Sequence, residues 1–163
     1  FGGTSGQGNT VTDSSCDGVG GAIKVDSDNE PSFGNSILSN SIVGNDCARG
    51  IFLRSGGNES ILAPTVTSAK FVGGKLYLTG TFSGPAKAKI LIQLFRTDPA
   101  DQANDINEGE SFVVQKQVKT DKTGFAKFNV KVPSDFTDGN ITATATNLKT
   151  GDTSEFSDYR EIS

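Results

Sequence analysis

The sequence contains no methionine, tryptophan or histidine. Because histidine is the commonest general base and a frequent zinc and copper ligand, its absence excludes Ser-His-Asp catalysis and imidazole metal sites. With no tryptophan and only two tyrosines, the chain has few of the flat aromatic rings that suit sugar stacking. The missing initiator methionine leads us to expect that these 163 residues are a piece of a longer protein.

Basic residues are scarce in the first sixty positions, where seven acids face three bases. The remaining residues hold twelve acids and twelve bases, so the net charge of −4 comes from the first part. A nucleic-acid partner is not expected, since binding phosphates requires a basic face. No apolar run has the length that a membrane helix needs, and we do not expect membrane insertion.

Only two cysteines are present, Cys16 and Cys47, and both lie in the first part of the chain. They have no CxxC spacing, and such a pair in a polar, β-rich chain is typical of a disulfide formed in an oxidising compartment. Two alternatives are a pair of reduced, buried thiols and a bridge between two chains. We predict that the two cysteines form a structural disulfide.

The first sixty residues carry repeats that fit neither a helix nor a single strand. In GNSILSNSIVGND (34–46), asparagine recurs every five residues, whereas helices repeat apolar residues at three or four and strands at two. The segment GGAIKVDSDN (20–29) also aligns with RGIFLRSGGN (49–58) at a spacing of 29, or of 28 when Ile23 is matched with Ile51.

Short parallel strands joined by tight turns, stacked as coils, explain both repeats. Asparagine suits the turns because it tolerates left-handed backbone and its amide can bond an asparagine of the neighbouring coil. Glycine suits positions where φ is positive. The residues expected to stack inside the coils are Val11, Ile23, Val25, Ile37, Ile42, Ile51 and Leu53.

The rest of the chain has the pattern of antiparallel strands separated by Gly, Pro, Asn and Asp turn signals. The predicted strands are 64–72, 75–83, 87–96, 111–119, 125–132, 140–147 and 154–160. Seven short strands favour a sandwich. In the strand 125–132, alternate apolar residues such as Phe128 are expected to face the core, and the lysines between them to face solvent.

Motifs along nearly the whole chain resemble a known family. FGGTSGQGNTV, GNSILSNSIVGND and RGIFLRSGGN resemble the final coils of right-handed parallel β-helix repeat proteins of bacterial surfaces. GTFSG (80–84), VKTDKTGFAKF (118–128) and ITATATNLKTGDTSEFS (141–157) resemble the β-rich tail that follows those coils. The resemblance implies an all-β fold: a short right-handed parallel β-helix of about two coils in residues 1–61, then an Ig-like or fibronectin-like antiparallel β-sandwich in residues 62–163.

Acidic residues gather in TDPADQANDINEGE (97–110), which contains Asp98, Asp101, Asp105, Glu108 and Glu110. Oxygen-rich loops are what Ca²⁺ selects, but the spacing matches no EF-hand. We interpret the segment as a solvated hairpin loop and keep a Ca²⁺ site there as the alternative. No other metal or cofactor is expected.

Two phenylalanines of the coil region, Phe33 and Phe52, have two interpretations. They either stack against neighbouring coils or seal the contact with the sandwich, or they are exposed and contact a ligand such as a glycan. The segment DTSEFS (152–157) is interpreted as part of the last strand, with Phe156 facing inward.

A β-helix ends in a coil with an unpaired strand edge, so we expect residues 62–163 to cover that edge. The predicted function is the non-catalytic C-terminal tip of a bacterial secreted or cell-surface fibre, which binds a glycan or another cell-surface ligand and associates through its coils, for example as a trimer. The predicted location is extracellular or on the bacterial surface, with the periplasm as an alternative. The alternative function is an accessory domain of a polysaccharide lyase or hydrolase whose catalytic coils lie upstream, and no catalytic residue is assigned.

Overall fold

The computed structural model describes residues 8–16, 20–100 and 107–163, and in these residues the protein is all-β. One short 3-10 turn, η1 (Gly57–Ser60), interrupts the strands. The strands are β1 (Thr10–Val11), β2 (Gly21–Asp26), β3 (Ser41–Ile42), β4 (Arg49–Arg54), β5 (Thr65–Phe71), β6 (Lys75–Ser83), β7 (Lys89–Thr97), β8 (Ser111–Lys119), β9 (Phe125–Pro133), β10 (Asn140–Asn147) and β11 (Arg160–Glu161).

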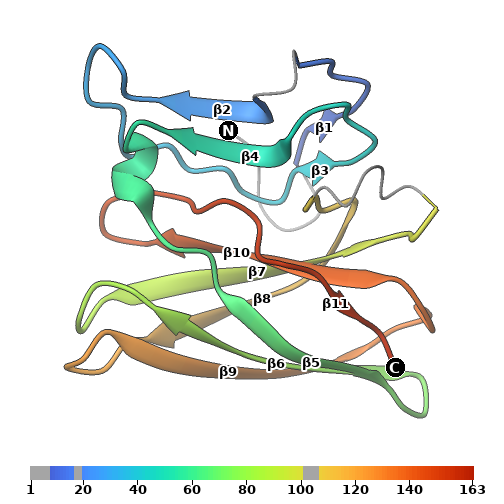
Figure 1. Cartoon of the computed structure of the whole chain (residues 1–163). Helices are drawn as coiled ribbons and strands as arrows, with labels where there is room; N and C mark the ends of the chain where they lie inside the picture. Colours follow the sequence, from blue (N-terminus) through green and yellow to red (C-terminus); the bar gives the residue numbers. More distant parts are fainter. Residues whose placement is uncertain (1–7, 17–19, 101–106) are drawn as a thin grey trace.

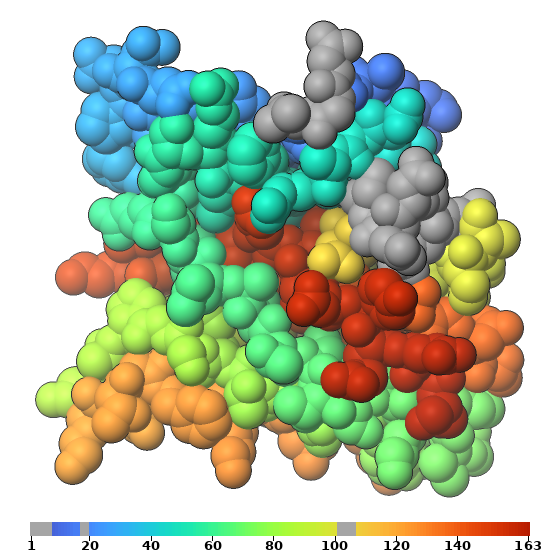
Figure 2. All heavy atoms as spheres, in the orientation of Figure 1, coloured from blue at the N-terminus to red at the C-terminus, as the bar shows by residue number. Residues whose placement is uncertain are grey.

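The strands are arranged in three layers (Figure 1). The region that contains β1 to β4, called here the N-terminal region (residues 8–61), lies at the top of the view. A four-stranded antiparallel sheet in the order β11-β10-β7-β8 lies below it, and a three-stranded antiparallel sheet, β5-β6-β9, lies at the bottom. Figure 2 shows that side chains fill the space between these layers. The two antiparallel sheets and the segments joining them are called here the C-terminal region (residues 62–163).

Nearly every residue of the central strands β7 and β10 is buried. Since successive side chains of a strand point to opposite faces, both faces of these strands are covered. One face is apolar, and Ile92, Leu94 and Ala143 belong to the core shared with the three-stranded sheet. The other face is mostly polar and points toward the N-terminal region, with Gln93 bonded to Ser39 and Phe95 as an apolar member. The four-stranded sheet is therefore a middle layer that serves two different neighbours.

The N-terminal region is built from short parallel pairs. Ile23 lies opposite Ile51 in the β2–β4 pair, which confirms the spacing of 28 and not the alternative of 29, and Val11 lies opposite Ile42 in the β1–β3 pair. The expected inward residues gather in one cluster: Val25, Ile37, Ile42 and Ile51 are buried, and Val11, Ile23 and Leu53 pack against them. Phe95 and Phe156 of the C-terminal region complete that cluster.

The five-residue repeat places a left-handed residue immediately before each asparagine. Gly34, Ser39 and Gly44 have φ values of 72°, 55° and 67°. The expectation that glycine takes the positive φ is confirmed at Gly34 and Gly44, and the left-handed residue at each turn stands in front of the asparagine.

The asparagine side chains instead join successive passes of the chain, as predicted. Asn40 Oδ1 accepts hydrogen bonds from the backbone N–H and the Nδ2 of Asn9, at 3.0 and 3.2 Å. Asn58 Oδ1 accepts the same two bonds from Asn35, at 3.0 and 3.1 Å. Each asparagine of this kind satisfies a backbone donor at a corner where no strand ladder can do so.

Six of the predicted strands of the second half are present, with ends shifted by at most two residues. The strand predicted at 154–160 is wrong, since only Arg160–Glu161 forms a strand there. Ser154 and Ser157 donate their backbone N–H groups to Ala145 and Ala143, so three residues of this segment match two of β10. That mismatch breaks the two-residue repeat of a ladder, although Phe156 is buried as predicted.

Candidate functional site

The most distinctive site is the junction between the N-terminal region and the four-stranded sheet. Five backbone N–H groups of the N-terminal region donate to side chains of the C-terminal region. The pairs are Gly34 with Asp152 Oδ1 at 2.6 Å, Ile37 with Thr153 Oγ1 at 3.0 Å, Ser39 with Gln93 Oε1 at 3.0 Å, Gly44 with Glu108 Oε2 at 2.9 Å and Leu53 with Glu155 Oε1 at 2.9 Å. The bonds from Ile37 and Ser39 are buried, and a buried N–H group without an acceptor costs about 1–3 kcal/mol. The other three bonds are partly buried, and all five side chains do what a further strand would do.

Backbone atoms also make contacts with each other across the junction. Ile42 and Gly109 exchange two hydrogen bonds of 2.8 and 2.9 Å, and the N–H of Gly50 donates to the carbonyl of Asn107 at 3.3 Å. A Cβ atom added at Gly109 would lie 2.7 Å from the ring of Phe156. The close approach of the two regions at this point therefore requires glycine.

Glu108 is the most deeply buried acid of the junction, with 1% of its surface exposed. Its carboxylate accepts hydrogen bonds from Asn45 Nδ2 at 2.8 Å and from the N–H of Gly44 at 2.9 Å. Burial raises the pKa of Glu108, and the bonds from Asn45 and Gly44 act in the opposite direction. The site thus holds a costly buried acid because its two oxygens match two donors at one corner of the N-terminal region.

Glu155 satisfies a backbone donor and a charged partner at the same time. One oxygen accepts from Leu53, and the other pairs with Arg49 Nη1 at 2.5 Å. Arg49 and Glu155 both line a cleft of about 530 Å³ that opens beside the junction. The ion pair is half-exposed and contributes little to stability, so the hydrogen bond to Leu53 is the structural contact.

Three phenylalanines hold the junction together by packing. Phe156 is 7% exposed, and its ring meets that of Phe95 edge to face with centroids 5.5 Å apart. Phe95 meets Phe112 in the same way at 5.9 Å. All three rings come from the C-terminal region and pack against the inward residues of the N-terminal region, so one apolar cluster spans the junction.

The predicted disulfide is confirmed: Cys16 and Cys47 are bonded within the chain, with Cα atoms 4.8 Å apart. The alternatives of reduced thiols and of an interchain bridge are therefore wrong. The bond lies next to the parallel bridge between Ser15 and Asp46 and links two successive passes of the N-terminal region. Its sequence separation of 31 equals that of the Val11–Ile42 pair, so it fixes the same register.

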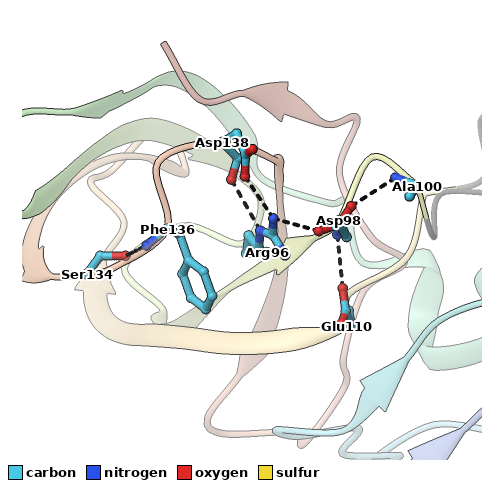
Figure 3. Close-up of polar contacts among 7 residues, drawn as sticks. All are labelled: Arg96, Asp98, Ala100, Glu110, Ser134, Phe136 and Asp138. Atoms are coloured by element: carbon cyan, nitrogen blue, oxygen red, sulfur yellow. Dashed lines mark hydrogen bonds and ion pairs between the residues drawn. The ribbon is translucent and has the colours of Figure 1, made fainter.

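The structure disperses the described acids of the 97–110 segment. Glu108 points into the junction, while Asp98 pairs with Arg96 Nη2 at 3.0 Å and accepts the N–H of Ala100 (Figure 3). Glu110 accepts the N–H of Asp98 at 2.9 Å. The bond from Ala100, followed by the contact with Arg96, lowers the pKa of Asp98.

Arg96 occupies the centre of this group and also pairs with Asp138 Oδ1 at 3.0 Å, with its guanidinium 5.1 Å from the ring of Phe136 (Figure 3). Asp101 and Asp105 lie outside the described residues. Among residues 8–16, 20–100 and 107–163, no group of three or more His, Cys, Asp or Glu side chains is placed to hold a metal ion. The Ca²⁺ alternative for the loop stays a prediction.

Phe33 and Phe52 have different surroundings. Phe33 is 64% exposed, so the expectation that it stacks between coils or seals a contact is wrong, and its role as a ligand contact stays a prediction. Phe52 is half-buried, with the guanidinium of Arg49 5.4 Å from its ring centroid. Neither residue takes part in the five hydrogen bonds from backbone N–H groups to side chains that join the two regions.

The sequence analysis did not identify Gln93, Asp152, Thr153 and Glu155 as acceptors. It placed Glu108 in a solvated loop, whereas the structure buries it. The one available signal was ITATATN in β10, where every second residue is a threonine although both faces of the strand are buried. A buried polar face predicts a polar partner, but it does not identify that partner.

Comparisons with known proteins add no identification: no protein-family model matches this chain, and no curated protein has a matching sequence. In the part of the chain that the structure describes, no helix is long and apolar enough to cross a membrane. The disulfide is compatible with an extracellular or periplasmic location.

Proposed function

We propose that this chain is the non-catalytic C-terminal tip of a secreted or cell-surface bacterial fibre. In this proposal residues 1–61 are the last coils of a right-handed parallel β-helix, and residues 62–163 form an Ig-like sandwich that caps them. The tip has a structural and an adhesive role, with a glycan or another cell-surface ligand as its partner.

The observation that supports the capping role is the row of five N–H groups bonded to Asp152, Thr153, Gln93, Glu108 and Glu155. Unpaired strand edges recruit other chains, and proteins protect themselves by covering those edges. Acceptors on flexible side chains can reach N–H groups at corners as well as in strands. A sheet with a polar upper face is therefore well suited to closing the irregular end of a coil.

The opposite side of the N-terminal region supports the fibre role. Within the described residues, β1 pairs only with β3 and β2 pairs only with β4. In that part of the chain, β1 and β2 each have a second edge that pairs with no strand, and a preceding coil, or a coil of another copy, would use it. The register of Ile23 over Ile51 is the register that stacked coils of one repeat would share.

The adhesive role is tested with the purified chain on an array of glycans and on intact cells, alongside a reducing-sugar assay. We expect saturable binding to at least one surface, no release of reducing ends, and no binding by heat-unfolded chain at the same concentration. Absence of binding to every surface would remove the adhesive role and leave the capping role. Release of reducing ends would replace the proposal with a catalytic one.

A further inference from the structure

A second cleft, of about 590 Å³, lies at one end of the antiparallel sheets, and none of the five side-chain acceptors of the junction lines it. Its walls are the loop between β6 and β7 and the turn after β10, which both lie at the left edge of the view in Figure 1, with η1 above them. The lining residues are Glu59, Pro85, Ala86, Lys87, Ala88, Lys89, Asn147, Leu148, Lys149 and Thr150. A volume of this size lies within the range of roughly 300–1,000 Å³ that ligand sites occupy.

Three lysines line this cleft: Lys87, Lys89 and Lys149. All three are exposed, and within the described residues none of them forms an ion pair. Lys119 lies opposite Lys89 in the β7–β8 ladder and adds a further positive charge at the same end of the sheet. Because like charges gathered without partners repel one another, such a group favours an anionic ligand.

The acids near this end offset the lysines only in part. Among the described residues that line the cleft, Glu59 is the only acid. Asp121 accepts hydrogen bonds from Thr123 and from the N–H of Phe125, and the carboxylate of Asp152 accepts the N–H of Gly34. The three lysines therefore outnumber the one acid that shares their cleft.

The uncharged part of the lining narrows the chemistry of the ligand. Pro85 and Ala86 form an apolar wall on one side, and Leu148, 45% exposed, forms one on the other. No aromatic side chain lines the cleft, so it offers no platform for stacking nucleic-acid bases. A cleft that combines apolar walls with ammonium groups fits a chain of acidic sugars. The C–H faces of the sugar rings can contact the walls, and the acid groups along the chain can contact the lysines.

We propose that the cleft formed by Lys87, Lys89, Lys149 and Leu148 binds an acidic polysaccharide that carries uronate carboxylates. This inference rests on the proposed adhesive role and names the class of ligand. The lysines bind the carboxylates as point charges, and the walls of the cleft contact the sugar rings. Binding weakens as salt is added, because the ammonium groups are exposed to solvent.

The test measures binding of the whole chain to polygalacturonate by isothermal titration calorimetry, at low and at physiological salt. The variant K87Q/K89Q/K149Q is expected to bind about tenfold or more weakly. The control variant K70Q/K75Q/K131Q loses the same charge from exposed lysines of the three-stranded sheet and is expected to keep its affinity within about twofold. Circular dichroism verifies that both variants are folded.

Fully methyl-esterified polygalacturonate, which has the same sugar rings without the charge, is the ligand control and is expected not to bind. Equal losses of affinity in the two lysine variants would show that binding responds to net charge alone, and would overturn the assignment of binding to the cleft. Equal or tighter binding of single-stranded DNA or polyphosphate through the same lysines would overturn the assignment to uronates. Failure to bind polygalacturonate while an array shows binding to a neutral glycan would overturn this inference and leave the proposed function standing.

Discussion

The variant Phe156→Ala is expected to lower the free energy of unfolding by about 3–5 kcal/mol, the range for removing a buried phenylalanine side chain. Phe156 belongs to the cluster that spans the junction: its ring meets that of Phe95, and it would lie 3.1 Å from a Cβ atom added at Gly50. Removal of this ring leaves a cavity between the two regions, which the hydrogen bonds across the junction hold in place. Unfolding in urea, followed by circular dichroism, gives the change.

Phe33→Ala is the matched control, because it is the same substitution at a side chain that is 64% exposed. We expect a change within about 0.5 kcal/mol. Equal effects of the two variants would show that the junction contributes no more than the surface does. A loss confined to Phe156→Ala, with the antiparallel sheets still folded at intermediate urea, would show that the N-terminal region separates first.

The second large effect is expected from the disulfide. The double variant Cys16→Ser, Cys47→Ser is expected to lose about 3–4 kcal/mol, because the bond closes a loop with a sequence separation of 31 and restricts the unfolded chain. The bond also holds the register of β1 on β3, in which short strands make few ladder hydrogen bonds. Urea unfolding of the oxidised chain and of the variant measures the difference.

Reductant supplies the control for the disulfide. Added to the unmodified chain, it should bring the stability down to that of the double variant, and added to the variant it should have no effect. If the variant were as stable as the oxidised chain, the disulfide would not be a structural element of the N-terminal region. A reductant effect on the variant would mean that the assay reports something other than this bond.

Much of the N-terminal region could be predicted because its residues repeat. Parallel strands of one repeat place like residues opposite like, and of the two spacings that the sequence allowed, the one that matches Ile23 with Ile51 is the register of the β2–β4 pair. Asparagine and glycine indicated the corners, where the positive φ falls on Gly34, Ser39 and Gly44, while the asparagines that follow bond to neighbouring passes of the chain or to the C-terminal region. Sequence pattern locates a corner, but it does not tell which of two turn-forming residues takes the positive φ.

The junction could not be predicted because its contacts have no sequence pattern. Gln93 meets Ser39 across 54 residues, and Asp152 meets Gly34 across 118. A single polar residue in a strand normally indicates the solvent side, and Gln93 is buried only because another layer covers that face of β7. The prediction of a strand at 154–160 failed for a different reason: three residues of this segment match two of β10, and no residue pattern indicates such a mismatch.

The central claim is that side chains of the C-terminal region satisfy the exposed N–H edge of the N-terminal region. Hydrogen exchange of the assigned backbone amides, measured by NMR on the whole chain, tests it most directly. The amides of Gly34, Ile37, Ser39, Gly44 and Leu53 are expected to exchange as slowly as those in the middle of β7 and β10. Exchange as fast as at Gly73 and Gly74, in the exposed turn between β5 and β6, would contradict it.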